Sequence, residues 1–341
     1  MKGKPTSFDI AYQAGVSQAT VSRALRGSPL VSAETRRRIQ AIAKELNYKV
    51  DKNASNLRRQ HSVTLALLLF EDPTSDDSLI NPFFMSMLGS ITRACARQGY
   101  DLLVSFQQLS DDWHADYQDS HKADGLILLG YGDYLIARPK FERLVQQGTH
   151  FVRWGAVAEG QAEISIGCDN VQGGRAITEH LLARGRRRIA FIGTAAPGCP
   201  EFFDRYRGHC EALSAAGIAL RPEAQADASD STELVGQQAL EELLARGEQF
   251  DAVFAASDLM AIGAMRALVE RGLRVPEDVA VVGFDDIPMA SFAHPPLTTV
   301  SQDTKRAGEV LVDVLLRQIR GEQVSSQMLP ARVVVRRSCG S

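Results

Sequence analysis

The 341-residue chain is 45% hydrophobic and 23% charged, a composition typical of a globular protein long enough for two or three structural units. Its apolar runs fall short of the roughly 20 residues of a membrane helix, its first residues lack the apolar core of a signal peptide, and its cysteines lack CxxC spacing. These features exclude an obvious membrane span and predict a cytoplasmic protein without disulfides or a zinc site.

Charge is distributed unevenly along the chain. The first 60 residues contain 12 basic and 4 acidic side chains, whereas the remainder contains 26 and 37. The formal net charge of −3 therefore conceals a segment of +8 and a segment of −11. Such asymmetry is typical of a nucleic-acid-binding module attached to an acidic body.

Residues 6–46 have the pattern of three short helices. Thr6 and Asp9 have capping-box spacing, Gly15 is placed to end the first helix, and Ser17 and Ser32 are placed to cap the next two. Apolar residues with helical spacing are expected to form the core, namely Val21, Ala24, Leu25, Ile39, Ile42, Ala43 and Leu46. This pattern leaves Gln18, Ala19, Ser22 and Arg23 facing outward on the second helix.

The following segment, residues 48–61, is polar and basic, with few apolar side chains. We expect a linker with a marginal helix at about 52–58, too short to be stable alone.

From residue 62 onward, short apolar runs alternate with amphipathic segments. Strands are predicted at 63–70, 101–106, 125–129, 150–154, 188–193, 251–256 and 279–284. Helices are predicted at 83–98, 138–147, 171–184, 204–216, 233–246, 259–271 and 304–320. Near-continuous apolar strands alternating with helices indicate parallel sheets covered on both faces, and the length of this part favours two lobes with a cleft.

Motifs spread over the whole chain resemble those of the lactose-repressor (LacI/GalR) family of bacterial regulators. The N-terminal ones are TSFDIAYQAGVSQATVSRAL at 6–25, VSAETRRRI at 31–39 and LNY at 46–48. Further matches are NPFF at 81–84, DNVQGG at 169–174, RYRG at 205–208, SDLMAIGA at 257–264, GLRVPEDVAVVGFDD at 272–286 and PLTTV at 296–300. The resemblance implies an all-α helix-turn-helix domain followed by an α/β, two-lobed, periplasmic-binding-protein-like (type I) effector domain with parallel sheets.

The resemblance also implies roles on DNA. Gln18, Ala19 and Arg23 match base-reading positions, where an amide suits adenine, a methyl group suits thymine and a guanidinium suits guanine. Positions that hold phosphates are matched by Thr6, Ser17, Thr20, Ser22 and Ser32. The alternative is that these residues are only caps and a solvated face; for Ser17 and Ser32, capping and phosphate contact are compatible.

In the linker, the resemblance assigns Leu57 to insertion between base pairs in the minor groove, and Ala54 to close approach of two paired linkers. A stray apolar residue on a flexible tether is the alternative for Leu57. The chain departs from the family because Val50 and Asp51 stand where a proline usually starts the linker helix, which removes a helix-start signal.

Between the lobes, the resemblance implies a site for a small-molecule effector, a mono- or disaccharide by family precedent. Arg205 matches the arginine that grips the ligand, and Asp285 matches the carboxylate that accepts its hydroxyls. Further candidates at strand ends or helix starts facing the cleft are Phe83, Phe84, Trp154 and Ser257. The segment ASDST at 228–232 lacks the large aromatic often found there.

Several of these residues have structural alternatives. Arg153 is equally compatible with a ligand contact and with pairing to a carboxylate, and Trp154 is at least as compatible with the core. Asp258 is most simply a cap for the following helix, and Asp286 a cap for a following turn. The run RGRRR at 184–188 is typical of a solvated surface.

Two other classes of protein fit less well. The sequence has no GxSxG, GxGxxG or Walker motif and no cluster with metal-ligand spacing, so we assign no catalytic or metal-binding residue, no cofactor and no enzyme activity. A free sugar-binding protein with the same lobes would have a signal peptide and no basic N-terminal module.

The sequence thus predicts a cytoplasmic homodimeric repressor that binds a pseudo-palindromic operator in double-stranded DNA under control of a small molecule. Its expected parts are a helix-turn-helix domain at 1–48, a hinge at 49–61 and an effector-binding and dimerisation domain at 62–341. The absence of a C-terminal leucine heptad favours a dimer over a tetramer.

Overall fold

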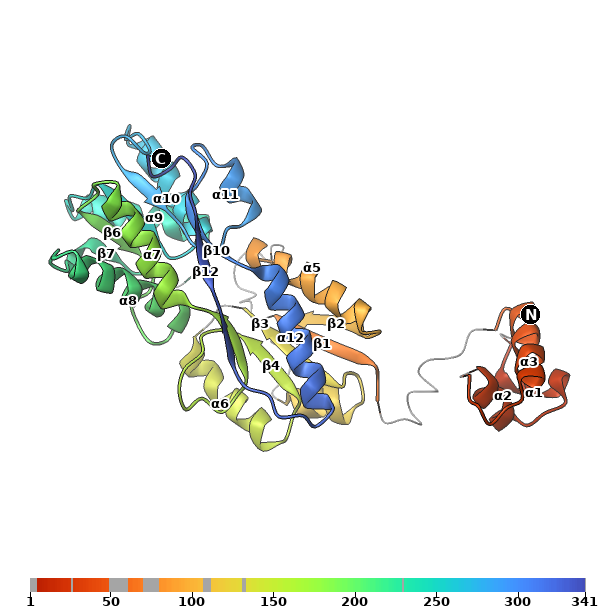
Figure 1. Cartoon of the computed structure of the whole chain (residues 1–341). Helices are drawn as coiled ribbons and strands as arrows, with labels where there is room; N and C mark the ends of the chain where they lie inside the picture. The colour runs from red at the N-terminus through yellow and green to blue at the C-terminus, as the bar shows by residue number, and fades with distance from the viewer. Residues whose placement is uncertain are drawn as a thin grey trace. The chain divides into compact units, whose positions relative to one another are not determined.

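The computed structural model describes residues 5–25, 27–48, 61–69, 80–106, 112–130, 133–228 and 230–340. The chain divides into two compact units, residues 1–62 and 63–341, whose elements are labelled in Figure 1. The hinge residues Val50, Ala54 and Leu57 lie outside the described residues. Among the helices that are described, none combines the length and the apolar character that a membrane span requires.

The first unit contains the three predicted helices, α1 (Ser7–Ala14), α2 (Gln18–Leu25) and α3 (Ala33–Glu45). At the start of α1, the backbone N–H and the hydroxyl of Thr6 both donate to the Asp9 carboxylate over 2.7 Å. Gly15 ends the helix in the left-handed conformation, with φ 61°. A small apolar core joins the helices, made by Ile10, Ala11, Ala14, Val21, Ala24, Val31, Ile39 and Ala43.

The second unit contains two parallel sheets. The six-stranded sheet has the order β11-β5-β4-β3-β1-β2, from β1 (Thr64–Leu69), β2 (Asp101–Phe106), β3 (Gly125–Leu129), β4 (Phe151–Trp154), β5 (Ser165–Cys168) and β11 (Gln327–Leu329). The four-stranded sheet has the order β7-β6-β8-β9, from β6 (Ile189–Ile192), β7 (Gln225–Ala226), β8 (Ala252–Ala255) and β9 (Ala280–Val282). Two further strands, β10 (Thr299–Gln302) and β12 (Ala331–Val334), form an antiparallel pair.

Helices pack in pairs on these sheets (Figure 1). The larger ones are α5 (Pro82–Arg97), α6 (Tyr134–Gln146), α7 (Asn170–Ala183), α8 (Pro200–Ala215), α9 (Glu233–Ala245), α10 (Asp258–Glu270) and α12 (Thr304–Ile319). Shorter helical segments are the π-helix η2 (His114–Asp119), the 3-10 helix η3 (Pro222–Ala224) and α11 (Pro288–Phe292). The six-stranded sheet and its helices form the first lobe, and the four-stranded sheet and its helices form the second. In the first lobe α12 packs on α5 and on β3, β4 and β5. In the second lobe α7 packs on α8, and α9 packs on α10.

The chain passes between the two lobes three times. It leaves the first sheet after β5, returns from β10 into α12, and crosses again between β11 and β12. Consequently β10 and β12, which pair with each other, both lie where the lobes are joined. Residues 302–304 and 329–331 are the second and third crossings.

All seven predicted strands are present, with ends within two residues of the prediction. The five strands that the sequence did not predict, β5, β7, β10, β11 and β12, have two to four residues each, too few for an apolar pattern to be recognised. Two helices begin four residues earlier than predicted. α6 begins at Tyr134 because the Asp133 carboxylate accepts the N–H groups of Leu135 and Ile136, and α8 begins at Pro200, which suits the first turn.

Candidate functional site

The outward face of α2 carries the predicted base-reading residues. Ala19 and Arg23 are exposed and lie one turn apart on this helix. Gln18 is half-buried, and its side-chain amide donates to the Ser7 hydroxyl over 2.8 Å. The opposite side of the helix is anchored by Val21 and Ala24, which are fully buried.

The predicted caps of α2 and α3 are present. The Ser17 hydroxyl accepts the Thr20 N–H over 3.2 Å, and the Ser32 hydroxyl accepts the Thr35 N–H over 3.2 Å. Thr6, Ser17 and Ser32 are exposed, and Thr20 and Ser22 are half-buried. Thr6, Ser17, Thr20 and Ser32 lie at or near helix N-termini, where free backbone N–H groups favour anions, whereas Ser22 lies in the middle of α2.

Arg205, in α8, is the central side chain of the second lobe and is only 1% exposed. Its Nε donates to Asn170 Oδ1 over 2.9 Å, its Nη1 donates to the Ala256 carbonyl over 2.5 Å, and the same nitrogen lies 3.5 Å from Asp285 Oδ1. The guanidinium also lies 3.9 Å from the centre of the Phe284 ring. Arg205 therefore holds together the start of α7 and the ends of β8 and β9.

Asp285 and Asp286 follow β9 in unusual backbone conformations, with φ 117° and 57°. Asp285 is buried, its N–H donates to the Val300 carbonyl over 2.8 Å, and its carboxylate accepts the Gln302 amide over 2.6 Å. Positive φ at two consecutive non-glycine residues is a form of strain often found at functional sites. Asp286 forms an ion pair with Arg336, 2.7 Å between Oδ1 and Nη2, rather than capping a turn.

The expected role of Asp258 as the cap of α10 was wrong, because the cap is Ser257. The Ser257 hydroxyl accepts the Met260 N–H over 3.3 Å and the Ser231 hydroxyl over 2.7 Å. The Asp258 carboxyl is fully buried and accepts the Thr299 hydroxyl and the Ile287 N–H. Burial, with Asp285 nearby, raises the pKa of Asp258 well above its usual range.

The three aromatic candidates, Phe83, Phe84 and Trp154, all belong to the buried core of the second unit. The Phe83 ring centre lies 5.3 Å from that of Phe84 and 6.1 Å from that of Trp154. Arg153 is buried in an ion pair with Glu163, 3.1 Å between Nε and Oε1, and its guanidinium lies over the Tyr134 ring. Of the two alternatives for Arg153, the structure shows the carboxylate pairing.

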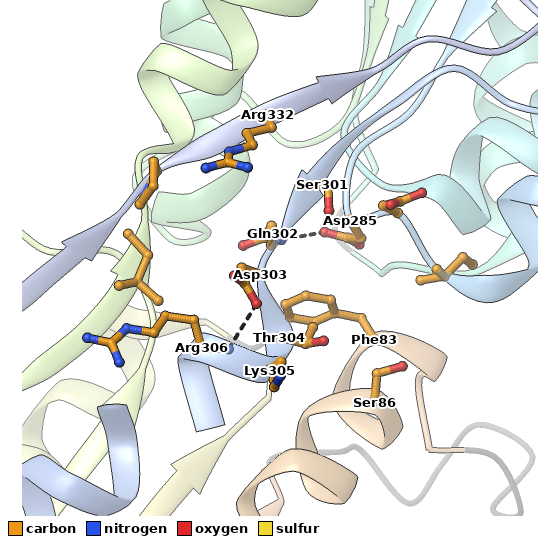
Figure 2. A pocket seen from close by; sticks show the side chains of 14 residues that line it. Phe83, Ser86, Asp285, Ser301, Gln302, Asp303, Thr304, Lys305, Arg306 and Arg332 are labelled. Atoms are coloured by element: carbon orange, nitrogen blue, oxygen red, sulfur yellow. Dashed lines mark hydrogen bonds between the residues drawn. The ribbon is translucent and has the colours of Figure 1, made fainter. Parts of the chain in front are cut away.

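A cavity of about 350 Å³ lies where the chain crosses between the lobes (Figure 2). Phe83 and Ser86 of α5 line one side, and residues 285–287, which follow β9, line another. The rest of the lining comes from the two crossing segments, residues 301–306 and 329–332. Phe83 and Asp285 are thus the two predicted effector residues that line this cavity, while Arg205 contacts Asp285 from the protein interior.

Several residues lining the cavity were missed by the sequence, including Gln302, Lys305, Arg306 and Arg332. They belong to β10, β12 and the start of α12, and the two strands were not predicted. The sequence pattern that indicates a strand was weak here, because both strands are short and each pairs with a segment distant in sequence. Over the described ranges, no three His, Cys, Asp or Glu side chains are placed to bind a metal ion.

Known proteins match this chain along its whole length. The family model for bacterial regulatory proteins of the lacI family matches residues 8–51, and the model for a periplasmic binding protein-like domain matches residues 178–339. The transcriptional regulator CelR of Thermobifida fusca is 35% identical over 339 residues, which cover 97% of this chain and 96% of CelR. The ribose operon repressor of Escherichia coli K12 is 31% identical over 329 residues, covering 95% and 96%.

Solved structures give the same result. The lac repressor dimer bound to operator and the anti-inducer ONPF has a TM-score of 0.84 at 29% identity, covering 99% of both chains. The CelR–cellobiose complex has a TM-score of 0.71 at 34% identity, covering 98% of this chain and 99% of that one.

A helix-turn-helix unit joined to a two-lobed periplasmic-binding-like unit defines a ligand-responsive, DNA-binding transcriptional regulator. With relatives of this identity and coverage, the chain belongs to the LacI family of bacterial regulatory proteins. Its relatives are transcriptional regulators, in agreement with the resemblance found in the sequence.

Proposed function

We propose that this protein is a cytoplasmic homodimeric repressor, not an enzyme, whose affinity for a pseudo-palindromic operator is controlled by a small molecule. The observation that carries the proposal is the cavity at the two crossing segments, lined by the first lobe, the second lobe and both crossings. A molecule bound there would contact both lobes and both crossing segments, and so could favour one arrangement of the lobes over another. It can therefore shift operator affinity by its differential affinity for the two arrangements.

The proposed effector is a mono- or disaccharide. The cavity volume of about 350 Å³ suits a small ligand, and Phe83, Asp285 and Gln302 offer a ring face, a carboxylate and an amide. Among the relatives, CelR was solved with cellobiose and the lac repressor with ONPG. Phe84, Trp154, Arg153, Ser257 and Arg205 are proposed to support the site.

On DNA, Gln18, Ala19 and Arg23 are proposed to read bases. The hydroxyl residues proposed to hold phosphates are Thr6, Ser17, Thr20, Ser22 and Ser32. Ala54 and Leu57 are proposed to act in the minor groove from a hinge at 49–61, between a DNA-binding domain at 1–48 and an effector domain at 62–341.

Dimerisation is proposed to use the edge strand β2 and the short helix α11. β2 exposes Leu103, Val104 and Phe106 by 39 to 49%, and α11 exposes Phe292 by 78%. An exposed apolar edge strand is a liability in a monomer and is suited to burial against a partner. The lac repressor relative was solved as a dimer on its operator.

The test is enrichment of the source genome's own fragments on the full-length protein, with a chain lacking residues 1–60 as control. Recovery of a few short pseudo-palindromes by the full-length protein alone is expected, and adjacent genes then nominate effectors to try. If, with those and a panel of sugars added, the full-length protein enriches nothing beyond the control, the repressor assignment fails.

A further inference from the structure

The carboxylates that line the cavity already have partners within the protein. Asp285 lies 3.5 Å from Arg205 and accepts the Gln302 amide over 2.6 Å. Asp286 pairs with Arg336 over 2.7 Å. Asp303 caps α12 by accepting the Arg306 backbone N–H over 2.9 Å. Each of these three carboxylates therefore already accepts a hydrogen bond from the protein itself or pairs with one of its cations.

The cations that line the cavity have no comparable partners. Lys305, Arg306 and Arg332 are all exposed. Arg306 is 4.0 Å from Glu309, which also pairs with Arg97 at 3.1 Å. Over the described part of the chain, the Lys305 and Arg332 side chains form no hydrogen bond or ion pair. The lining thus presents an excess of donors that are available to a ligand.

These cations come from two elements that meet at the cavity. Arg332 projects from β12, and Lys305 and Arg306 project from the first turn of α12. In Figure 2 the guanidinium groups of Arg332 and Arg306 lie apart from each other along one side of the pocket, Lys305 lies near Thr304, and Gln302 and Asp285 lie together on another side. The two arginines therefore give one side of the pocket a positive charge, separate from the side with a carboxylate and an amide.

Guanidinium groups bind carboxylate and phosphate oxygens through paired, charge-assisted hydrogen bonds. A neutral sugar has no charged acceptor with which these guanidinium groups could form such bonds. We propose that the effector is an anionic sugar derivative, whose phosphate or carboxylate group binds at the side of the pocket that carries Arg332 and Arg306. Its hydroxyl groups then face Asp285 and Gln302. This proposal rests on the proposed function, because it concerns the same cavity.

The experiment compares the wild-type full-length protein with the double variant R306Q/R332Q and with R317Q. Arg317 lies near the other end of α12, roughly 16 Å along the helix from Arg306, and controls for a general loss of positive charge on this helix. The probes are glucose 6-phosphate, gluconate, inorganic phosphate and glucose, titrated by calorimetry at constant ionic strength. Circular dichroism verifies that all three proteins are folded.

We expect at least one anionic probe to bind the wild-type and R317Q proteins alike, and to bind R306Q/R332Q about 10-fold or more weakly, because two charged hydrogen-bonding partners are lost. Preference for glucose 6-phosphate or for gluconate then identifies the group as phosphate or carboxylate. Equal anion binding by all three proteins overturns the proposal, because the anion then binds elsewhere. Absence of anion binding to the wild type overturns it as well.

Failure of this inference is separable from failure of the proposed function. If glucose binds as tightly as glucose 6-phosphate to the wild type and to R306Q/R332Q, the anionic effector is excluded while a sugar-responsive regulator remains. Operator recovery from genomic fragments does not depend on these cations, so its loss in the wild-type protein counts against the proposed function alone.

Discussion

At the scale of single residues, one side chain determines how the second lobe is held together at the cavity. Arg205 bonds to Asn170, to the Ala256 carbonyl and to Asp285, and it is almost fully buried. Removing one partner of a buried ion pair leaves the other charge without compensation, which costs more than the pair contributes. Arg205 therefore supports the fold as well as the proposed effector site.

We expect Arg205→Ala to lower the free energy of unfolding by about 3–5 kcal/mol and to abolish the response to effector. The folded fraction should keep its operator affinity, because the base-reading residues lie in the other unit. Urea unfolding and operator titration with effector measure the two effects. Arg207→Ala is the matched control on the same helix, since Arg207 is 54% exposed, and it should change stability by at most about 0.5 kcal/mol. A variant at Arg205 that responds fully to effector would remove this residue from the site.

His209 is a second buried residue with a measurable consequence. It is enclosed by Phe191, Tyr206 and Phe254, bonds to the Thr178 hydroxyl over 3.0 Å, and burial lowers its pKa to about 4 from the ordinary 6.5. The folded protein therefore keeps this imidazole neutral at pH values where the unfolded chain protonates it.

His209 should make the protein less stable in acid. Above pH 6.5 the imidazole is neutral in both the folded and the unfolded chain. As the pH falls from 6.5 to about 4, only the unfolded chain takes up the proton, so the free energy of unfolding drops by about 3 kcal/mol in total. Urea unfolding at a series of pH values should show this slope in the wild type and a reduced slope in His209→Gln. The exposed His294→Gln variant serves as control and should keep the wild-type slope. Identical slopes for all three proteins would show that His209 titrates normally in the fold.

At the scale of elements, α2 combines a buried face with an exposed one, so that the residues proposed to read bases can change without loss of the fold. Val21 and Ala24 are fixed in the core, while Ala19 and Arg23 are exposed. The helix is set by the cap at Ser17. The residues that stabilise this short helix are therefore different from those proposed to read bases.

Arg23→Ala is expected to weaken binding to the cognate operator by about 1–3 kcal/mol and to relax preference at one base pair in each half-site. Binding to random DNA should change little. The exposed Arg37 on α3 provides a charge-matched control, since Arg37→Ala should affect all sequences alike. Competition assays with single-base operator variants measure both effects. Equal losses for Arg23→Ala on operator and random DNA would mean that Arg23 contacts only the backbone.

At the scale of the whole molecule, assembly is expected to depend on the edge of the six-stranded sheet. β2 and β11 are the two edge strands, and both expose apolar side chains. Of the two, only β2 exposes several large apolar side chains, Leu103, Val104 and Phe106. This number of exposed apolar side chains on one edge strand favours β2 for dimer contact.

Val104→Glu should raise the dimer dissociation constant about 10-fold or more, because it places a charge in an apolar interface. Operator binding should weaken with it, since two half-sites must be bound together. Sedimentation velocity over a range of concentrations gives the dissociation constant. Met328→Glu on β11, at the opposite edge, is the control and should remain dimeric. A dimeric Val104→Glu protein would place the interface elsewhere.

The sequence predicted those features of the fold that depend on interactions between residues close together in the chain. The caps at Ser17 and Ser32, the left-handed Gly15 and the apolar faces of α2 and α3 are fixed by residues within one or two turns, and all were predicted. The long apolar strands β1 and β3 were predicted because both faces of their sheet are covered, which requires uninterrupted apolar residues.

The tertiary structure decided what depends on contacts distant in sequence. β10 and β12 form a pair although about 30 residues separate them in the sequence, and Asp258 is buried with Thr299 and Ile287 as its donors. Arg332 and Arg306 line the same cavity because the chain crosses between the lobes there. The sequence by itself thus determined the three helices of the first unit and the class of regulator. The lining of the cavity, and with it the proposed charge of the effector, depends on packing between segments far apart in the sequence. No pattern within either segment predicts that they lie together.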